Sequence, residues 1–300
     1  MNMKVPISIG IPAYNEEKNI GKLLTALLHQ RTKRVTIDEI IVISSGSTDK
    51  TDEIVRRFSE RDERIMLVRQ EQRKGKASAV NEFLKIAENK ILVLESADTI
   101  PAKETIESLC LPLLNEKVGM VGAHPIPTND KNTFMGYAVH LLWELHNQIS
   151  LRTPKCGELV AFRKLFEKIP EDTSVDEAWI EYEIKKRGYK IVYVPSAIVY
   201  NKGPETIKDY IKQRRRITCG HIDLKKRTGY RVSTTNLKIT LAMLLRLFPY
   251  KKPKEWTYFV GACTLEGLGR LLGYYDYYIN KRKHVIWEIA RTTKEVNVSV

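Results

Sequence analysis

The chain has 300 residues, of which 43% are hydrophobic and 29% are charged, with 16 Gly, 12 Pro and 4 Cys. This composition is typical of a globular chain with one large or two ordinary domains, and it excludes collagen-like, disordered and disulfide-scaffold proteins. The net charge of +14 is concentrated in residues 201–300, where 21 Lys and Arg face 8 Asp and Glu, so nucleic acid, an anionic membrane or a phosphorylated substrate could each be attracted.

Through the first 120 residues, short β-branched runs alternate with helix-like segments. The runs are 7–11, 40–43, 65–68, 91–94 and 118–121, and the helical segments between them are 16–30, 49–60, 76–88 and 102–115. Strands that alternate with helices of about 10–15 residues predict a Rossmann-like, mainly parallel α/β sheet flanked by helices. Ligands of such sheets bind at the carboxyl ends of the strands.

Beyond residue 120 the pattern is looser. It predicts a helix at 133–150, a strand at 159–162, a helix at 175–187 and a strand at 190–194. Two later segments, 237–248 and 256–278, carry apolar residues at helical spacing. We therefore expect an α/β domain over residues 1–220 and a basic, amphipathic helical C-terminal region over residues 221–300.

Polar loops follow three of the expected strands, at residues 12–16, 44–49 and 95–98. Because the carboxyl ends of parallel strands share one edge of a sheet, these loops are expected to converge there. Asn15, Ser47 and Thr48 have a second interpretation, as caps of the helices that follow them.

Seven ordered segments between about residues 5 and 220 form a recognisable set. They are IPAYNEEKNIGKLL (11–24), IDEIIVISSGSTDKT (37–51), RKGKASAVN (73–81), ILVLESADTIP (91–101), GELVAFRK (157–164), DEAWIEYEIKKRGYKIVYVP (176–195) and GPETIKDYIKQRRR (203–216). Together they resemble family 2 glycosyltransferases, including lipid-associated members of the polyprenyl-phosphate type. The resemblance implies the glycosyltransferase-A fold, a nucleotide-sugar donor and transfer with inversion.

The resemblance also implies a donor site in the first loops. It assigns donor contacts to Pro12, Tyr14, Glu16, Ser45, Lys74 and Gly75. An aromatic ring such as Tyr14 can stack on a base, and a glycine permits close backbone approach. Ser44 and Ser45 stand where the family usually has two aspartates, and a hydroxyl brings no charge to the nucleoside.

The fourth strand is followed by Ser96-Ala97-Asp98, where families of this fold commonly have Asp-x-Asp. The resemblance implies that Asp98 binds Mg²⁺ or Mn²⁺ beside the sugar diphosphate, with Ser96 in the first aspartate position. Magnesium often uses one or two carboxylates together with substrate phosphates and water, so a single aspartate is compatible with this role. The alternative is an exposed loop aspartate.

Two acids, Asp176 and Glu177, begin the helix expected at 175–187. The resemblance places Glu177 as the base that deprotonates an acceptor hydroxyl, with Asp176 beside it. Acids at a helix start also have a purely structural interpretation, because they complement the helix dipole. An acceptor lipid phosphate is already ionised and needs little help from a base.

Residues 213–216 read Gln-Arg-Arg-Arg and resemble the Gln-x-x-Arg-Trp motif of the family, with Ile217 in place of tryptophan. The resemblance assigns Gln213 and Arg216 to the departing nucleoside diphosphate, because a guanidinium can hold two oxygens at once. A solvated basic helix is the alternative. His221 could hold a metal or be structural.

The longest stretches without a charged residue have only 12 residues, which predicts no transmembrane helix, and the amino end shows no cleaved export signal. The four cysteines have no metal or redox spacing. We expect a cytoplasmic protein. Its apolar, aromatic and lysine-rich C-terminal segments suit peripheral docking on the inner membrane face, although helices packed on the catalytic domain would look the same.

These observations predict a metal-assisted, inverting glycosyltransferase that transfers a sugar from a nucleotide-sugar to a glycan or to a lipid-linked acceptor, a polyprenyl phosphate or a saccharide. One alternative is a non-catalytic member of the fold that binds a nucleotide or glycan. Another is a nucleic-acid-binding protein that uses its basic C-terminal third. No nucleic-acid partner is expected, because the sequence has no RNA-recognition or zinc motif.

Overall fold

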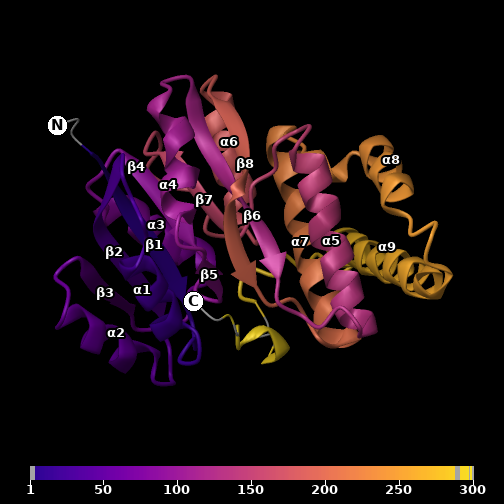
Figure 1. Cartoon of the computed structure of the whole chain (residues 1–300), viewed down its shortest axis with the longest axis horizontal. Coiled ribbons are helices and arrows are strands. Elements are labelled where there is room, and N and C mark those ends of the chain that lie inside the picture. The colour runs from indigo at the N-terminus through magenta and orange to yellow at the C-terminus, as the bar shows by residue number, and fades with distance from the viewer. Residues whose placement is uncertain (1–3, 288–290, 297, 299–300) are drawn as a thin grey trace.

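The computed structural model describes residues 4–287, 291–296 and 298. Figure 1 shows strands and helices that alternate through the first half and helices that gather in the second half. In chain order the elements are β1 (Val5–Ala13), α1 (Ile20–Leu28), β2 (Val35–Ser45), α2 (Thr51–Ser59), β3 (Ile65–Gln70), α3 (Lys76–Ile86), β4 (Ile91–Glu95), β5 (Thr99–Pro101), α4 (Thr105–Cys110), β6 (Val118–Pro127), α5 (Phe134–Ser150), β7 (Leu159–Arg163), α6 (Asp176–Lys186), β8 (Lys190–Asn201), α7 (Ile207–Thr228), α8 (Leu237–Leu247) and α9 (Trp256–Tyr278).

Eight strands of the described residues form one sheet in the order β3-β2-β1-β4-β7-β6-β8-β5. Neighbours pair in parallel from β3 to β4 and again between β6 and β8. β7 runs antiparallel to both β4 and β6, and β5 runs antiparallel to β8. The predicted α/β sheet flanked by helices is confirmed, and β7 and the edge strand β5 run opposite to the other six strands.

The sheet is buried on both faces, as continuous apolar strands require. In β2, Ile40 and Val42 belong to a core that includes residues of α1, whereas Ile41 and Ile43 belong to a second core that includes residues of α3 and α6. Because successive side chains of a strand point to opposite faces, one strand supplies both cores. Two helical layers therefore hold the strand ends in place.

Several element boundaries differ from the prediction, most clearly in two helices and one strand. The helix expected at 102–115 is divided into α4 and a 3-10 turn over residues 111–114, because Pro112 has no N–H to continue an α-helix. The helix expected from residue 16 begins at Ile20. The strand expected at 190–194 continues as β8 to Asn201, because it also pairs with β5 and with the far end of β6.

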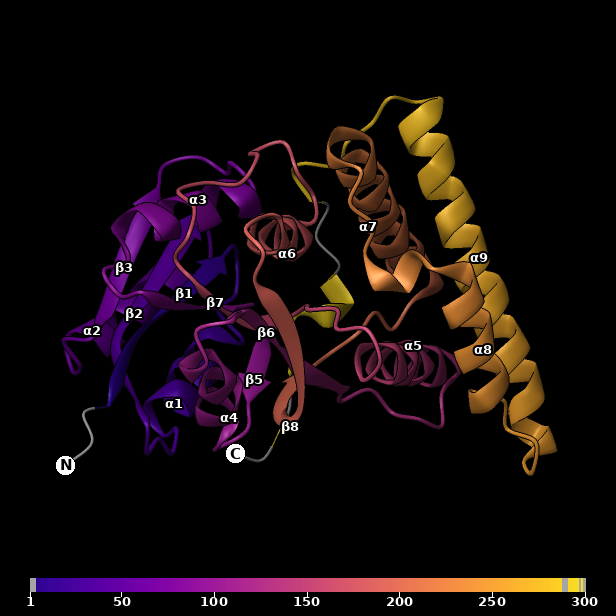
Figure 2. The ribbon, with the colours of Figure 1, turned by 90° about the horizontal axis from the view of Figure 1, so that it is seen from above.

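Helices α5, α7, α8 and α9 form a lobe beside the sheet (Figures 1 and 2). α7 and α9 approach closely at Gly269 and Gly273, where an added Cβ would meet Arg214 and Thr218 of α7. The boundary expected at residue 220 falls inside α7, and Val296 is packed in the core beside α1. No helix in the described part of the chain has both the length and the apolar character that a bilayer crossing requires.

Gly10 lies in the middle of β1, directly under the ring of Phe83 on α3. An added Cβ at Gly10 would overlap that ring, and Phe83 is fully buried. We expect Gly10→Ala to lower the free energy of unfolding by about 1–3 kcal/mol, as overpacking does, in urea titrations. Gly267→Ala in α9 is the matched control, because nothing lies within 4 Å of its added Cβ. Equal stability of the two variants would contradict this packing.

Candidate functional site

A cavity of about 460 Å³ opens where the strand-end loops face the helical lobe. Its lining includes most of the residues assigned from the sequence, namely Pro12, Tyr14, Glu16, Ser45, Gly75, Ser96, Asp98, Glu177, Gln213 and Arg216. Two assigned residues, Lys74 and Asp176, are absent from the lining. Lys74 donates its backbone N–H to Ser45 Oγ at 3.1 Å, and Asp176 is buried with 1% of its surface exposed.

Hydrogen bonds between their side chains and backbone hold the first two loops together. Asn15 has a left-handed backbone with φ of 52°, its N–H donates to Ser47 Oγ at 3.1 Å, and its Oδ1 accepts from the Thr48 N–H at 2.8 Å. The residues that precede α1 and α2 are Asn19 and Lys50, and neither makes a side-chain cap. The interpretation of Asn15, Ser47 and Thr48 as helix caps is therefore wrong: they join the two loops to each other.

The loop before α3 completes this end of the cavity. The Arg73 guanidinium lies 3.9 Å from the centre of the Tyr14 ring, so the ring already has a cation on one face. Gly75 has φ of 93°, a conformation that other residues rarely adopt, and it leads directly into α3. A planar aromatic, an arginine and a bare backbone turn are thus brought to one edge of the sheet.

Acidic side chains gather around Asp98. The Ser96 N–H donates to the carbonyl of Glu158 at 3.2 Å, which brings the loop before β7 to the Ser-x-Asp turn. Burial, and then the charge of Asp98, raises the pKa of Glu158 and of Glu16 to about 7 each. Glu95 is fully buried, which raises its pKa to about 8. Glu158 received no role from the sequence, although it lies within one of the matched motifs.

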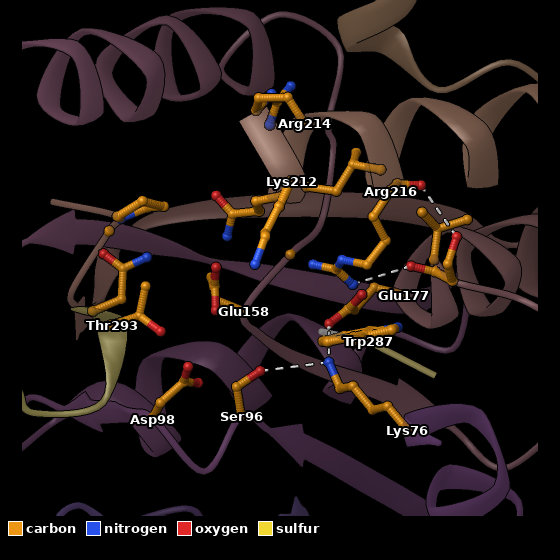
Figure 3. Close-up of a pocket in the computed structure, with 18 of the residues that line it drawn as sticks. Lys76, Ser96, Asp98, Glu158, Glu177, Lys212, Arg214, Arg216, Trp287 and Thr293 are labelled. Carbon is orange, nitrogen blue, oxygen red and sulfur yellow. Dashed lines mark hydrogen bonds and ion pairs between the residues drawn. The ribbon is translucent and has the colours of Figure 1, made fainter. Parts of the chain in front are cut away.

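Lys76 holds the acidic pair at the start of α6, and Figure 3 shows it beside Glu177 and Ser96. Its Nζ lies 2.6 Å from Glu177 Oε1, 3.0 Å from Asp176 Oδ2 and 3.5 Å from Ser96 Oγ. Burial acts to raise the pKa of Glu177, but the Lys76 ammonium outweighs it and lowers that pKa to about 2. Burial and the neighbouring Glu177 charge raise the pKa of Asp176. In this state Glu177 is ionised, paired and a weak base.

The three consecutive arginines at 214–216 of α7 have different partners. Arg214 pairs with Glu266 of α9 at 2.7 Å, and Arg215 pairs with Asp276 of α9 at 2.6 Å. Arg216 instead donates to the Ser174 carbonyl at 3.3 Å beside the acidic pair, and burial lowers its pKa to about 10. The interpretation of these residues as a solvated basic helix is therefore wrong, since each arginine has a protein partner.

After α9 the chain returns toward the sheet as a C-terminal strap, here defined as residues 279–287 and 291–296 (Figure 1). His284, Trp287 and Lys294 of this strap line the cavity. His284 Nε2 lies 2.9 Å from Asp276, and Lys294 contacts both Glu16 and the Tyr14 carbonyl, the latter at 3.2 Å. The Val296 N–H donates to Asn19 Oδ1 at 3.0 Å, and the Val296 side chain is fully buried.

Trp287 brings the strap to the part of the cavity beside Lys76 and Arg216. Its ring centre lies 3.4 Å from Arg216 Cζ and 5.6 Å from Lys76 Nζ. The motif position after Arg216 is Ile217, so an aromatic ring reaches this arginine from the strap instead. Sequence reasoning missed this contact, because nothing local to the strap indicates a partner about 70 residues earlier in the chain.

We expect Val296→Asp to release the strap, because a carboxylate at this fully buried position would have no partner. Hydrogen exchange of strap amides should rise by about tenfold or more, while exchange in β1 and β4 is unchanged. Glu295→Gln is the control, because the side chain of Glu295 is 50% exposed. Unchanged exchange in the strap of Val296→Asp would show that this anchor does not hold it.

Two profiles of known protein families match the chain. The profile of the family described as "Glycosyl transferase family 2" matches residues 8–173, and that of "Glycosyl transferase family group 2" matches residues 91–271. Among solved structures, the mannosyltransferase PcManGT from Pyrobaculum calidifontis, in complex with GDP-Man and Mn²⁺, is similar at a TM-score of 0.69 and 21% identity over 93% of this chain and 89% of that one. The glycosyltransferase-A fold predicted from the sequence is thereby confirmed.

Two curated relatives resemble the chain over a shorter range. The probable glycosyltransferase YdaM of Bacillus subtilis (strain 168) is 27% identical over 231 residues, which are 72% of this chain and 55% of that protein. The poly-beta-1,6-N-acetyl-D-glucosamine synthase of Staphylococcus aureus (strain COL) is 26% identical over 71% of this chain and 54% of that protein. The chain thus spans about half the length of these relatives. Because the family profile matches more than half of its residues, the chain belongs to glycosyl transferase family 2.

Proposed function

We propose that this chain is a metal-assisted, inverting glycosyltransferase that transfers a sugar from a nucleotide-sugar donor to a glycan or lipid-linked acceptor. One observation carries the proposal: a single cavity joins Tyr14, Asp98 and Glu177, which come from three separate loops. Its volume lies within the range of about 300–1,000 Å³ that small-molecule sites occupy. The aromatic ring of Tyr14 suits the nucleoside, and the acidic centre at Asp98 suits the diphosphate with its cation. The carboxylate of Glu177 suits the reacting sugar and its acceptor.

The acidic centre fits a divalent cation. Asp98, Glu158 and Ser96 offer hard oxygen atoms. Burial first, and the charge of Asp98 second, raise the pKa values of Glu158 and Glu16, and a cation would relieve the second of these effects. We propose that Mg²⁺ or Mn²⁺ is held by Asp98 with help from Glu158 and Ser96. When bound, the ion would neutralise charge that develops on the departing diphosphate.

The remaining steps use residues of the chain. Tyr14 packs against the base, Gly75 lets the backbone approach the donor, and Arg216 faces the diphosphate oxygens. The acceptor oxygen attacks the anomeric carbon from the side opposite the diphosphate, and the electron pair of the broken C–O bond leaves with the nucleoside diphosphate. For a hydroxyl acceptor, Glu177 acts as the base only after it separates from Lys76, because the ion pair lowers its basicity.

A donor panel tests this proposal. The protein is incubated with nucleotide-sugars, Mn²⁺ and detergent-solubilised lipid or glycan acceptors, and nucleoside diphosphate release and glycosylated products are measured by mass spectrometry. We expect one donor to give a metal-dependent product. Binding of nucleotides without release from any donor across the panel would favour the non-catalytic alternative and contradict transfer.

We also propose that the outer end of the helical lobe docks on an anionic membrane surface. Leu237, Leu241 and Leu245 lie one turn apart on α8 and are 69%, 51% and 67% exposed. The turn between α8 and α9 carries the exposed lysines 251, 252 and 254, and α9 exposes Val260, Leu268, Leu271 and Tyr274. Apolar side chains beside lysines match the acyl and charged layers of such a surface.

Vesicle flotation tests this surface. The wild type should float with vesicles of phosphatidylglycerol and phosphatidylcholine, and a Leu241→Glu, Leu245→Glu variant should not. Met66→Glu is the control, because Met66 is 50% exposed but lies on β3, far from the lobe in Figure 1. Equal flotation of both variants would contradict the assignment, and salt-dependent binding of RNA by the wild type in place of vesicles would favour a nucleic-acid partner.

A further inference from the structure

The cavity continues from the acidic pair into the helical lobe, where its lining changes character. Here its walls include Val139, Leu142, Leu145 and Ile149 of α5, together with Thr240 of α8. Leu145 and Ile149 also pack against Met243 of α8, so this arm of the cavity ends beside the helix that exposes the leucine stripe. We call this part of the cavity the apolar arm.

The wall of the cavity that contains the apolar arm also contains a buried lysine. Lys155 follows α5, is only 9% exposed and lines the cavity. Its Nζ donates to the carbonyl of Cys156, and among the described residues no Asp or Glu lies within 4 Å of that Nζ to form an ion pair. Lys155 acts over a longer distance on Glu177, whose pKa it helps to lower, and its Nζ has no carboxylate of the described chain in direct contact, so it offers a site for an anion in the cavity.

The surroundings of Lys155 are also positive. Arg214 and Arg270 line the same cavity and share a single carboxylate, Glu266, at 2.7 Å each. Lys155, Arg214 and Arg270 thus place three cations at this wall, where Arg214 and Arg270 contact Glu266 and Lys155 contacts no carboxylate of the described residues. A positive wall of this kind attracts an anionic group such as a phosphate.

Two histidines complete the wall with neutral donors. Burial and the nearby Lys155 lower the pKa of His146 to about 3, and burial lowers the pKa of His221 well below its usual value. His146 Nδ1 is buried without a hydrogen-bond partner among the described residues. A neutral imidazole keeps one N–H for an acceptor atom, so these rings suit a ligand rich in oxygen.

The acidic pair adds an independent argument about the nucleophile. Glu177 Oε1 is 2.6 Å from Lys76 Nζ, and this ion pair leaves the carboxylate poorly placed to remove a proton. A phosphate oxygen carries no proton that must be removed before it attacks. The catalytic end of the cavity and the basic wall therefore favour the same class of acceptor.

Resting on the proposed transfer function, we propose that the apolar arm and Lys155 form the acceptor site, which binds a lipid monophosphate with its phosphate at Lys155 and its hydrocarbon chain between α5 and α8. A phosphate oxygen forms a bond to the anomeric carbon while the bond from that carbon to the donor diphosphate breaks. The electron pair leaves with the nucleoside diphosphate. The product is a glycosyl phosphodiester, and no proton is transferred.

Calorimetric titration with dodecyl phosphate, dodecanol and inorganic phosphate tests the site without any donor. We expect the wild type to bind dodecyl phosphate at least about tenfold more tightly than either dodecanol or inorganic phosphate, because both parts of the ligand contribute. Lys155→Gln should lose about tenfold or more for dodecyl phosphate. Lys164→Gln is the matched control, since Lys164 also donates to a backbone carbonyl, that of Ala87 at 2.6 Å, but does not line the cavity.

A second variant, Leu142→Trp, fills the apolar arm and should weaken binding of dodecyl phosphate while binding of inorganic phosphate is retained. Equal affinity of the wild type for dodecanol and dodecyl phosphate, or equal affinity of Lys155→Gln and Lys164→Gln for dodecyl phosphate, would overturn the site. Donor release measured in parallel separates the two proposals. Metal-dependent donor turnover without lipid phosphate binding would overturn the acceptor site and leave the transfer function standing. Lipid phosphate binding without turnover of any donor would overturn the transfer function and leave the lipid phosphate site standing.

Discussion

Asp98→Asn is expected to reduce sugar transfer by about 100- to 1,000-fold, the effect of removing one preorganised charge from a transition state in an enclosed site. Asp98 interacts electrostatically with both Glu16 and Glu158, and its charge raises the pKa of each. The amide keeps the shape of the side chain and removes the charge that would hold the cation. Initial rates of nucleoside diphosphate release at saturating Mn²⁺ measure the effect.

Asp38→Asn is the control for this change, because Asp38 is an exposed residue of β2 outside the cavity lining. We expect its rate to equal that of the wild type. Rates for Asp98→Asn within about twofold of this control would mean that Asp98 takes no part in transfer, and the cation would then have to be held elsewhere or not be needed.

Lys76→Met is expected to produce the largest loss of stability. The side chains of Lys76, Asp176 and Glu177 are only 14%, 2% and 18% exposed, so removal of the ammonium leaves two adjacent buried carboxylates without their ion-pair partner. Breaking a buried ion pair in this way costs about 3–5 kcal/mol. The free energy of unfolding at pH 7, from urea titration, should fall by this amount relative to the wild type.

The pH dependence of Lys76→Met should have the opposite sign to that of the wild type. In the wild type the pKa of Glu177 is lowered to about 2, so its stabilising contribution is complete above about pH 4.5 and is lost as pH falls toward 2. Without Lys76, burial raises the carboxylate pKa values, so the variant gains stability as pH falls below 7. Lys85→Met, at an exposed position of α3, is the control, and equal stability of the two variants at pH 7 would contradict the account.

The sequence predicted those parts of the site that follow from local pattern. Apolar runs followed by polar residues located the ends of β1, β2 and β4, and Tyr14 and Asp98 follow two of those ends. The direction of β7 was not predictable, because a short apolar run is the same whether its strand runs parallel or antiparallel to its neighbours. The helix after β5 is divided at Pro112, and this proline is a signal in the sequence itself that a continuous helix over 102–115 would be interrupted.

Contacts between residues distant in the chain account for the rest. Lys76 lies within the matched segment 73–81, and its pairing with Glu177 depends on how α3 and α6 pack. Adjacent residues of a helix point about 100° apart, so Arg215 and Arg216 reach different partners, and only the position of α9 decides which one faces the cavity. The sequence of the C-terminal strap has no periodicity that marks Trp287 as a cavity residue. The residues that contact the Trp287 ring, Lys76 and Arg216, belong to α3 and α7.

The location of a bound cation tests the central claim most directly. Crystals grown with Mn²⁺ and a nucleoside diphosphate would show manganese by its anomalous scattering. The account predicts a peak within about 2.5 Å of an Asp98 carboxylate oxygen, with the base of the nucleotide against Tyr14. A peak instead at Cys219, Asp276 and His284, whose ligand atoms lie within 4.8 Å of one another, or a nucleotide bound away from Asp98, would contradict it.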